Sequence, residues 1–119
     1  RRLLNLGHTV GHAIEAVSGY TVPHGSAVSI GMATATRAAC RRGLCAPETL
    51  SALENLLAAY GLPTATDYTA QALAVAALAD KKRRGDTLPL VLPEAIGRCR
   101  LEPVPVSELP DWFRDGGLL

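Results

Sequence analysis

All three histidines of the chain lie within its first 24 residues, and two of them, His8 and His12, are four residues apart. On a helix this spacing places both rings on one face, and Glu15 extends that face. Imidazole nitrogens beside a carboxylate suit a zinc-type divalent ion, or proton transfer near neutral pH. The same spacing also fits two ordinary helix residues with a solvated Glu15. Metal binding and proton transfer are therefore hypotheses that the spacing alone does not decide.

The third histidine, His24, follows a proline and opens a second apolar segment. A loop between the two segments would bring it back over the first helix as a third nitrogen, although by itself it is an ordinary helix-start residue. Gly7 and Gly11 each precede a histidine, and each weakens an interior helix position by about 1 kcal/mol relative to alanine. A stripe without side chains admits another helix, a cofactor or a substrate close to the backbone, and the sequence leaves these alternatives open.

A cluster of cations, residues 81–84 (K-K-R-R), ends another predicted helix. Such a cluster is typical of a solvated helix end. The functional alternative is that Arg1 and a lysine of the cluster hold the phosphate or carboxylate of an anionic substrate. No glycine-rich phosphate loop and no G-x-G-x-x-G motif follows a strand, so we expect no dinucleotide site within this chain.

Apolar periodicity and helix-breaking residues predict the elements that position these groups. We expect a mainly α fold, one helical domain over residues 1–119 with a small β-strand pair. The segment 24–42 is apolar nearly all round and is predicted to be the central helix. Pro89 should confine the first strand to a sheet edge or to its own beginning. Ser107 is expected to cap the last helix, and the Gly116-Gly117 tail to fray. The helices are predicted at 1–17, 24–42, 47–60, 69–82 and from 107 onward, and the strands at 88–92 and 98–102.

The amino-acid composition narrows the classes of molecule that the chain is expected to bind. Twelve Lys and Arg against eleven Asp and Glu leave a net charge of +1, which gives no global reason to expect nucleic acid or an acidic membrane as partner. Apolar runs such as 72–79 fall far short of the roughly 18 residues of a membrane span, and no signal pattern opens the sequence, so a cytoplasmic protein is expected. The three cysteines lack C-x-x-C spacing, and we interpret them as small buried hydrophobes or free thiols.

Several blocks of the sequence resemble one enzyme family. Residues 4–15, L-N-L-G-H-T-V-G-H-A-I-E, resemble the L-N-x-G-H-T-x-G-H-A-I-E signature of dehydroquinate synthases. Residues 23–32, P-H-G-S-A-V-S-I-G-M, are similar to that family's H-G-E-A-V-A-I-G-M segment. Residues 80–82, 90–92 and 96–97 are similar to its D-K-K, F-V-L and I-G blocks. Order and separations agree over nearly the whole chain, which matches the carboxy-terminal, mostly helical half of that enzyme.

The resemblance implies an activity. This family of lyases converts 3-deoxy-D-arabino-heptulosonate 7-phosphate into 3-dehydroquinate and phosphate in the shikimate pathway of aromatic amino acid biosynthesis. It uses zinc or cobalt and a recycled NAD, which the amino-terminal half binds. We therefore expect a phosphosugar substrate, an amino-terminal NAD-binding domain as partner, and a chain of 119 residues that is inactive alone. A homodimer is also expected, because the face toward that domain would otherwise be exposed.

The resemblance also implies roles for individual residues. A carboxylate from the other half would complete the metal site. Matching the motifs position by position gives metal ligands His8 and His24, substrate contact or proton relay by His12, substrate binding by Asn5 and Arg1, an anion anchor at Lys81 or Lys82, and orientation of a histidine by Glu15.

One position departs from the family pattern. Position 26 is serine where the family usually has glutamate, and a hydroxyl cannot replace that charge. An authentic dehydroquinate synthase is favoured because the other blocks fit. The alternatives are a related sugar phosphate cyclase with a different product, or a noncatalytic helical interaction module. A nucleic-acid binder using residues 81–84 is disfavoured by the near-neutral charge and the few aromatic residues.

Overall fold

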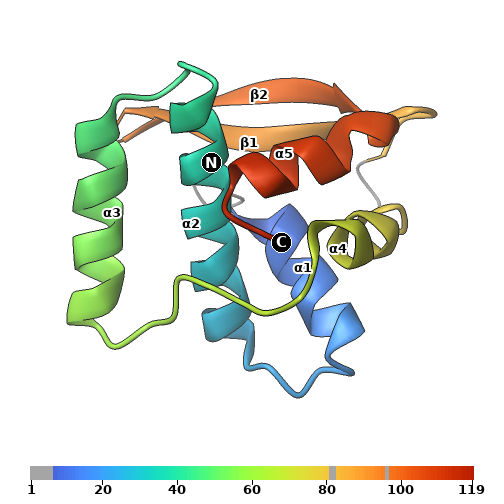
Figure 1. Ribbon diagram of the computed structural model, residues 1–119, viewed down its shortest axis with the longest axis horizontal. Helices are drawn as coiled ribbons and strands as arrows, with labels where there is room; N and C mark the ends of the chain where they lie inside the picture. Colours follow the sequence, from blue (N-terminus) through green and yellow to red (C-terminus); the bar gives the residue numbers. More distant parts are fainter. Residues whose placement is uncertain (1–6, 81–82, 96) are drawn as a thin grey trace.

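The computed structural model describes residues 7–80, 83–95 and 97–119. Within these residues the helices surround a central helix, and a β-hairpin covers one side of them (Figure 1). None of the described helices is long and apolar enough to cross a membrane. In chain order the elements are α1 (His8–Val17), α2 (His24–Arg41), α3 (Pro47–Ala59), α4 (Ala70–Ala77), β1 (Thr87–Ala95), β2 (Arg98–Pro105), the 3-10 turn η2 (Val106–Glu108) and α5 (Leu109–Asp115).

The central helix is α2, as predicted. It packs against α1, α3, α5 and β1. Most of its buried residues are small, and the buried Thr34 and Thr36 donate their hydroxyls to the carbonyls of Ile30 (2.8 Å) and Met32 (2.7 Å). Because these hydroxyls are satisfied by the helix's own backbone, neighbouring elements can pack closely on all sides of α2.

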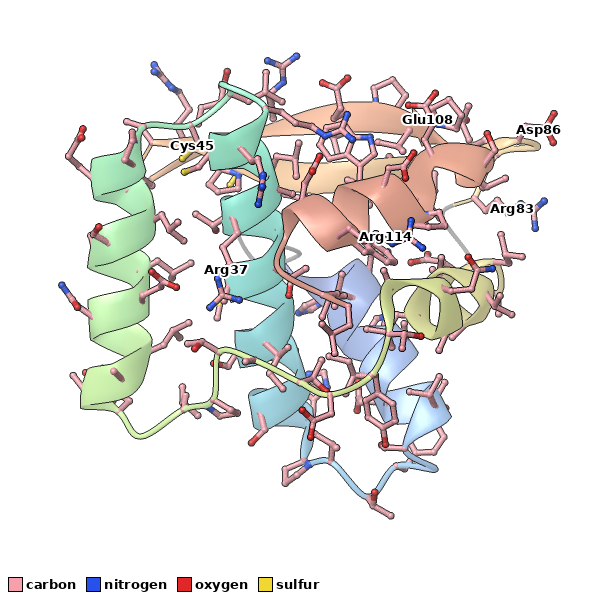
Figure 2. The ribbon with its side chains drawn as sticks, viewed as in Figure 1. Arg37, Cys45, Arg83, Asp86, Glu108 and Arg114 are labelled. Atoms are coloured by element: carbon pink, nitrogen blue, oxygen red, sulfur yellow. The ribbon has the colours of Figure 1, made fainter. Side chains whose placement is uncertain are left out.

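Helix α3 is attached to the central helix mainly by polar contacts. Leu57 is the buried residue of α3. The guanidinium of Arg37 on α2 donates to the Glu54 carboxylate of α3 at 2.9 Å and to the carbonyl of Thr64 at 2.8 Å. Figure 2 shows Arg37 on α2, on the side toward the connection that follows α3. This arginine fixes both α3 and the linker to α2.

The two strands form an antiparallel hairpin that is longer than predicted. Pairing runs from Thr87 opposite Pro105 to Pro93 opposite Cys99, with an irregularity between Pro93 and Ala95. Leu88 and Leu92 of β1 are fully buried, so this strand supplies a face of the core. Within the described residues the sheet has two strands, and both are therefore edges, as Pro89 required.

Two helix ends differ from the prediction. The helix predicted over 1–17 does not continue through Gly7, whose φ of +81° is left-handed, so α1 begins at His8. The part of this prediction at 1–6 lies outside the described residues. The fourth helix was predicted to reach residue 82, but α4 ends at Ala77. There the amides of Ala79 and Asp80 bond to carbonyls three residues back, which tightens the chain into a turn.

The expectations for the carboxy-terminal end are also wrong. Ser107 lies inside η2, and α5 starts at Leu109 without a side-chain cap. The tail does not fray, because Leu118 is only 7% exposed and the carbonyl of Leu119 accepts a hydrogen bond from the Ala70 amide at 2.9 Å. Burial of one leucine and a bond to the first residue of α4 outweigh the freedom of the two glycines.

Candidate metal and substrate site

Helices α1 and α2 cross at glycines, and this crossing positions all three histidines. A Cβ at Gly31 would overlap the carbonyl oxygen of Gly7. A Cβ at Gly11 would lie 3.2 Å from the Ala27 carbonyl oxygen and 3.2 Å from the Cα of Val28. The glycine stripe of α1 therefore admits a neighbouring helix, which decides among the alternatives that the sequence left open.

The three imidazole rings lie together at this crossing. The ring centroids of His8 and His12 are 5.3 Å apart, those of His8 and His24 are 6.0 Å apart, and those of His12 and His24 are 6.4 Å apart. His8 and His12 come from one face of α1, and His24 is the first residue of α2. The short loop at 18–23 thus returns His24 over the first helix, as the sequence suggested.

Glu15 contacts the ring of His24. Its Oε1 is 3.1 Å from Nδ1 of His24, and the exposed fractions of the two side chains are 15% for Glu15 and 61% for His24. A carboxylate that accepts a hydrogen bond from Nδ1 fixes the ring and its tautomer. Nε2 is then the nitrogen of His24 that a metal ion would bind.

The histidine geometry fits a divalent ion as two ligands of a larger set. Two imidazoles on one Zn²⁺ have ring centroids about 5–6 Å apart, because each bound nitrogen lies about 2.0–2.1 Å from the ion. The His8–His24 and His8–His12 pairs both satisfy this separation, and it is the motif match that assigns His8 and His24 to the metal. Within residues 7–80, 83–95 and 97–119, no group of three or more His, Cys, Asp or Glu side chains could hold a metal ion. A complete site therefore requires a ligand from outside these residues.

A pocket of about 440 Å³ opens between α1 and α4, next to the histidines. Its walls are largely alanine methyl groups, and His12, Asp80, Thr9 and Tyr20 supply the polar groups. Sequence reasoning assigned no role to Asp80 or Tyr20, because residues of α1 and α4 are brought together only by packing. The lining residues are Thr9, His12, Ala13, Ala16, Tyr20, Ala76, Ala77, Ala79 and Asp80.

Four of the residues assigned to substrate, Arg1, Asn5, Lys81 and Lys82, lie outside the described residues. Arg83, which follows them, donates from Nε to the carbonyl of Gly85 at 2.7 Å. Figure 2 shows Arg83 and Asp86 on the same side of the molecule, where β1 begins. Arg83 thus stabilises the turn that precedes β1.

Ser26 and the three cysteines are further residues that the sequence singled out. Ser26 is half-buried in the first turn of α2, two residues after His24. All three cysteines are free thiols, as interpreted from the sequence. Burial, followed by a hydrogen bond with Cys45, raises the pKa of Cys40 to about 11. Burial is also the main cause that raises the pKa of Cys99, with Glu94 next.

Comparison with known proteins identifies the family. The model of the family "3-dehydroquinate synthase C-terminal" matches residues 1–83. The chain belongs to the 3-dehydroquinate synthase family. The synthase of Syntrophotalea carbinolica is 44% identical over 106 residues, which cover 87% of this chain and 29% of that relative. The synthase of Streptococcus pneumoniae is 39% identical over 115 residues, which cover 95% and 32%. This synthase-family chain thus spans about a third of the length of these relatives.

Solved structures of sugar phosphate cyclases share the fold. A 2-deoxy-scyllo-inosose synthase complexed with carbaglucose-6-phosphate, NAD+ and Co²⁺ matches with a TM-score of 0.73 and 28% identity, covering 94% of this chain and 34% of that one. A 2-epi-5-epi-valiolone synthase from Streptomyces hygroscopicus with NAD+ and Zn²⁺ bound matches with a TM-score of 0.80. It covers 97% of this chain and 32% of that one, and at 24% identity it shows the fold alone. The predicted fold class, a helical carboxy-terminal domain with a small strand pair, is confirmed.

Proposed function

We propose that this chain is the metal- and substrate-binding part of a 3-dehydroquinate synthase, which converts 3-deoxy-D-arabino-heptulosonate 7-phosphate into 3-dehydroquinate and phosphate in the shikimate pathway. The main support is the cluster of three imidazoles with centroids 5.3–6.4 Å apart, formed by residues of the two family motifs at 4–15 and 23–32. The 44% identity to a curated synthase supports the same reaction.

In this proposal His8 and His24 hold Zn²⁺ or Co²⁺, and Glu15 orients His24 through the 3.1 Å contact with Nδ1. A carboxylate from the nucleotide-binding part of a longer protein completes the ligand set. When bound, the ion supplies Lewis acidity toward a substrate hydroxyl, and NAD accepts a hydride. Both cyclase neighbours carry NAD+ with one of these metals.

His12 is proposed to move protons. His12 is exposed, its ring lies beside that of His8, and it lines the pocket between α1 and α4. An imidazole reached by both solvent and pocket can take a proton from a bound substrate and pass it to water. Elimination of phosphate and ring closure both require such a carrier.

The remaining roles rest on the motifs. Asn5 and Arg1 are proposed to bind substrate, and Lys81 or Lys82 to hold its anionic end. A guanidinium and an ammonium suit carboxylate and phosphate oxygens. We propose a cytoplasmic enzyme without nucleic-acid or membrane partners, in line with the net charge of +1. A homodimer is a further part of the proposal.

The direct test starts from the complete coding region of the gene that encodes this chain. The full-length product should release phosphate from the heptulosonate phosphate when NAD+ and Zn²⁺ or Co²⁺ are supplied, and His12→Asn should lower kcat. Mass and NMR analysis of the product distinguishes 3-dehydroquinate from the product of a related cyclase. This alternative is worth testing because Ser26 stands where the family usually has glutamate. A gene that encodes these 119 residues alone would refute the enzyme assignment and leave a noncatalytic helical module. The isolated 119 residues should be inactive, and phosphate release by them would refute that part.

A further inference from the structure

The pocket between α1 and α4 has one wall that the proposed mechanism does not use. Tyr20 lines this pocket together with His12 and Asp80. Its exposed fraction is 77%, so its ring contributes little to the core. An aromatic ring that is held at a pocket of about 440 Å³ without being buried in the fold is available to a ligand.

The backbone of Tyr20 is strained. Among the described residues it is the one non-glycine residue with a positive φ, +63°. The end of α1 imposes this conformation, because the Tyr20 amide donates to the Glu15 carbonyl at 2.8 Å and the Gly19 amide to the Ala16 carbonyl at 3.1 Å. Glycine would adopt it without strain. A bulky side chain in such a position points to a role outside folding.

The chemistry of the pocket selects the kind of group that enters. Alanine methyl groups form most of the wall, and the polar groups are the His12 imidazole, the Asp80 carboxylate and the hydroxyls of Thr9 and Tyr20. Such polar groups exchange hydrogen bonds with hydroxyl groups, and methyl groups pack against C–H surface. The lining thus fits the hydroxylated carbon skeleton of a sugar.

We propose that the Tyr20 ring packs against the carbon skeleton of the phosphosugar substrate, and that the α1–α4 pocket takes the hydroxyl-bearing end of that substrate. The inference rests on the proposed function, because His12 belongs both to this pocket and to the ring cluster. Tyr20 is therefore a residue that determines substrate affinity and specificity, and it takes no part in proton transfer.

The test compares three variants in the full-length protein. Tyr20→Gly removes the ring and the backbone strain together, so its melting temperature should be no lower than that of the parent. Its KM should rise about 3- to 10-fold with kcat little changed, as expected for loss of a contact made equally in ground and transition states. Tyr20→Phe keeps the ring and should keep the parent KM.

The matched control is Tyr60→Gly. Tyr60 is 76% exposed and also caps the end of a helix, but that helix is α3, which lies on the other side of α2 from α1 and α4 (Figure 1). This variant should keep the parent KM. A parent-like KM in Tyr20→Gly, or a Tyr20→Phe variant as impaired as Tyr20→Gly, would overturn the inference while the synthase assignment stands. A parent protein that releases no phosphate would overturn the proposed function, and this inference with it.

Discussion

Replacing Gly31 by alanine is expected to push α1 and α2 apart and to weaken the proposed metal site at the same time. A Cβ at this position would overlap the Gly7 carbonyl oxygen and would lie 3.0 Å from the amide nitrogen of Gly11. Both contacts are with backbone atoms, so no side-chain rotation relieves them. One helix must move relative to the other.

The size of the effect follows from two opposing terms. Overpacking costs about 1–3 kcal/mol, and the upper half of this range applies because backbone is displaced. Alanine has a better helix propensity than glycine, which recovers about 1 kcal/mol. The net loss for Gly31→Ala is about 1–2 kcal/mol, which lowers the melting temperature of a domain of this size by about 4–10 °C. Because ligand sites need placement within about 0.5 Å, the shift of α2 should also lower the affinity for Zn²⁺ or Co²⁺ by about tenfold or more.

The control is Gly25→Ala in the first turn of the same helix. A Cβ at Gly25 meets nothing within 4 Å, so this variant gains helix propensity without overlap. Thermal unfolding of the two variants and the parent, with metal affinity measured against a competing chelator, gives the comparison. If Gly31→Ala melted at the temperature of Gly25→Ala and bound metal as tightly as the parent, the crossing would not set the site and the reasoning would be wrong.

Three further changes test other contacts. Glu15→Gln should raise the Kd for Zn²⁺ about 10- to 100-fold, because His24 loses the carboxylate that orients it, and an unchanged Kd in chelator competition would contradict this. Burial raises the pKa of Cys40 from an ordinary 9.0 to about 11, so at pH 9 its alkylation by iodoacetamide should be about 50-fold slower in the folded than in the unfolded chain. For the same reason folding stability should fall as pH rises from 9 toward 11, and equal alkylation rates in the two states would count against both statements. Leu118→Ala should cost about 2–3 kcal/mol in urea unfolding, whereas Leu119→Ala, at a residue 78% exposed, should stay within about 0.5 kcal/mol; equal losses would mean that the tail is not docked.

Helix boundaries were predictable where the sequence places a proline or a glycine next to the helix end. The ends of α2 and α3 agree with the sequence to within one residue, because proline precedes or opens each helix and Gly43 and Gly61 follow them. The start of α1 was not predictable in this way. Gly7 is left-handed and lies against the α2 backbone, and this approach is a tertiary contact that periodicity does not reveal.

The candidate site was likewise predictable where local sequence decides and unpredictable where tertiary packing decides. The four-residue spacing already placed His8 and His12 on one face, and the short loop made the return of His24 plausible. The pocket had no local signal, because Tyr20 and Asp80 are sixty residues apart and meet only where α4 packs on α1. The tail was misjudged for a related reason: glycines set its local freedom, but the burial of Leu118 decides its position.

The histidine cluster is fixed from within the fold and open toward its outer side. Glu15 is 15% exposed and holds a ring that is itself 61% exposed, while the glycine crossing fixes the other two rings at 5.3 and 6.0–6.4 Å. Two imidazoles leave the tetrahedral set of a zinc ion half filled, and a catalytic zinc takes a third protein ligand and keeps one position for substrate or water. Among the described residues no group of three or more such side chains could hold a metal ion, and in the proposed site the third ligand is a carboxylate from a further part of the enzyme. The exposed ring of His24 leaves room for such a ligand beside it.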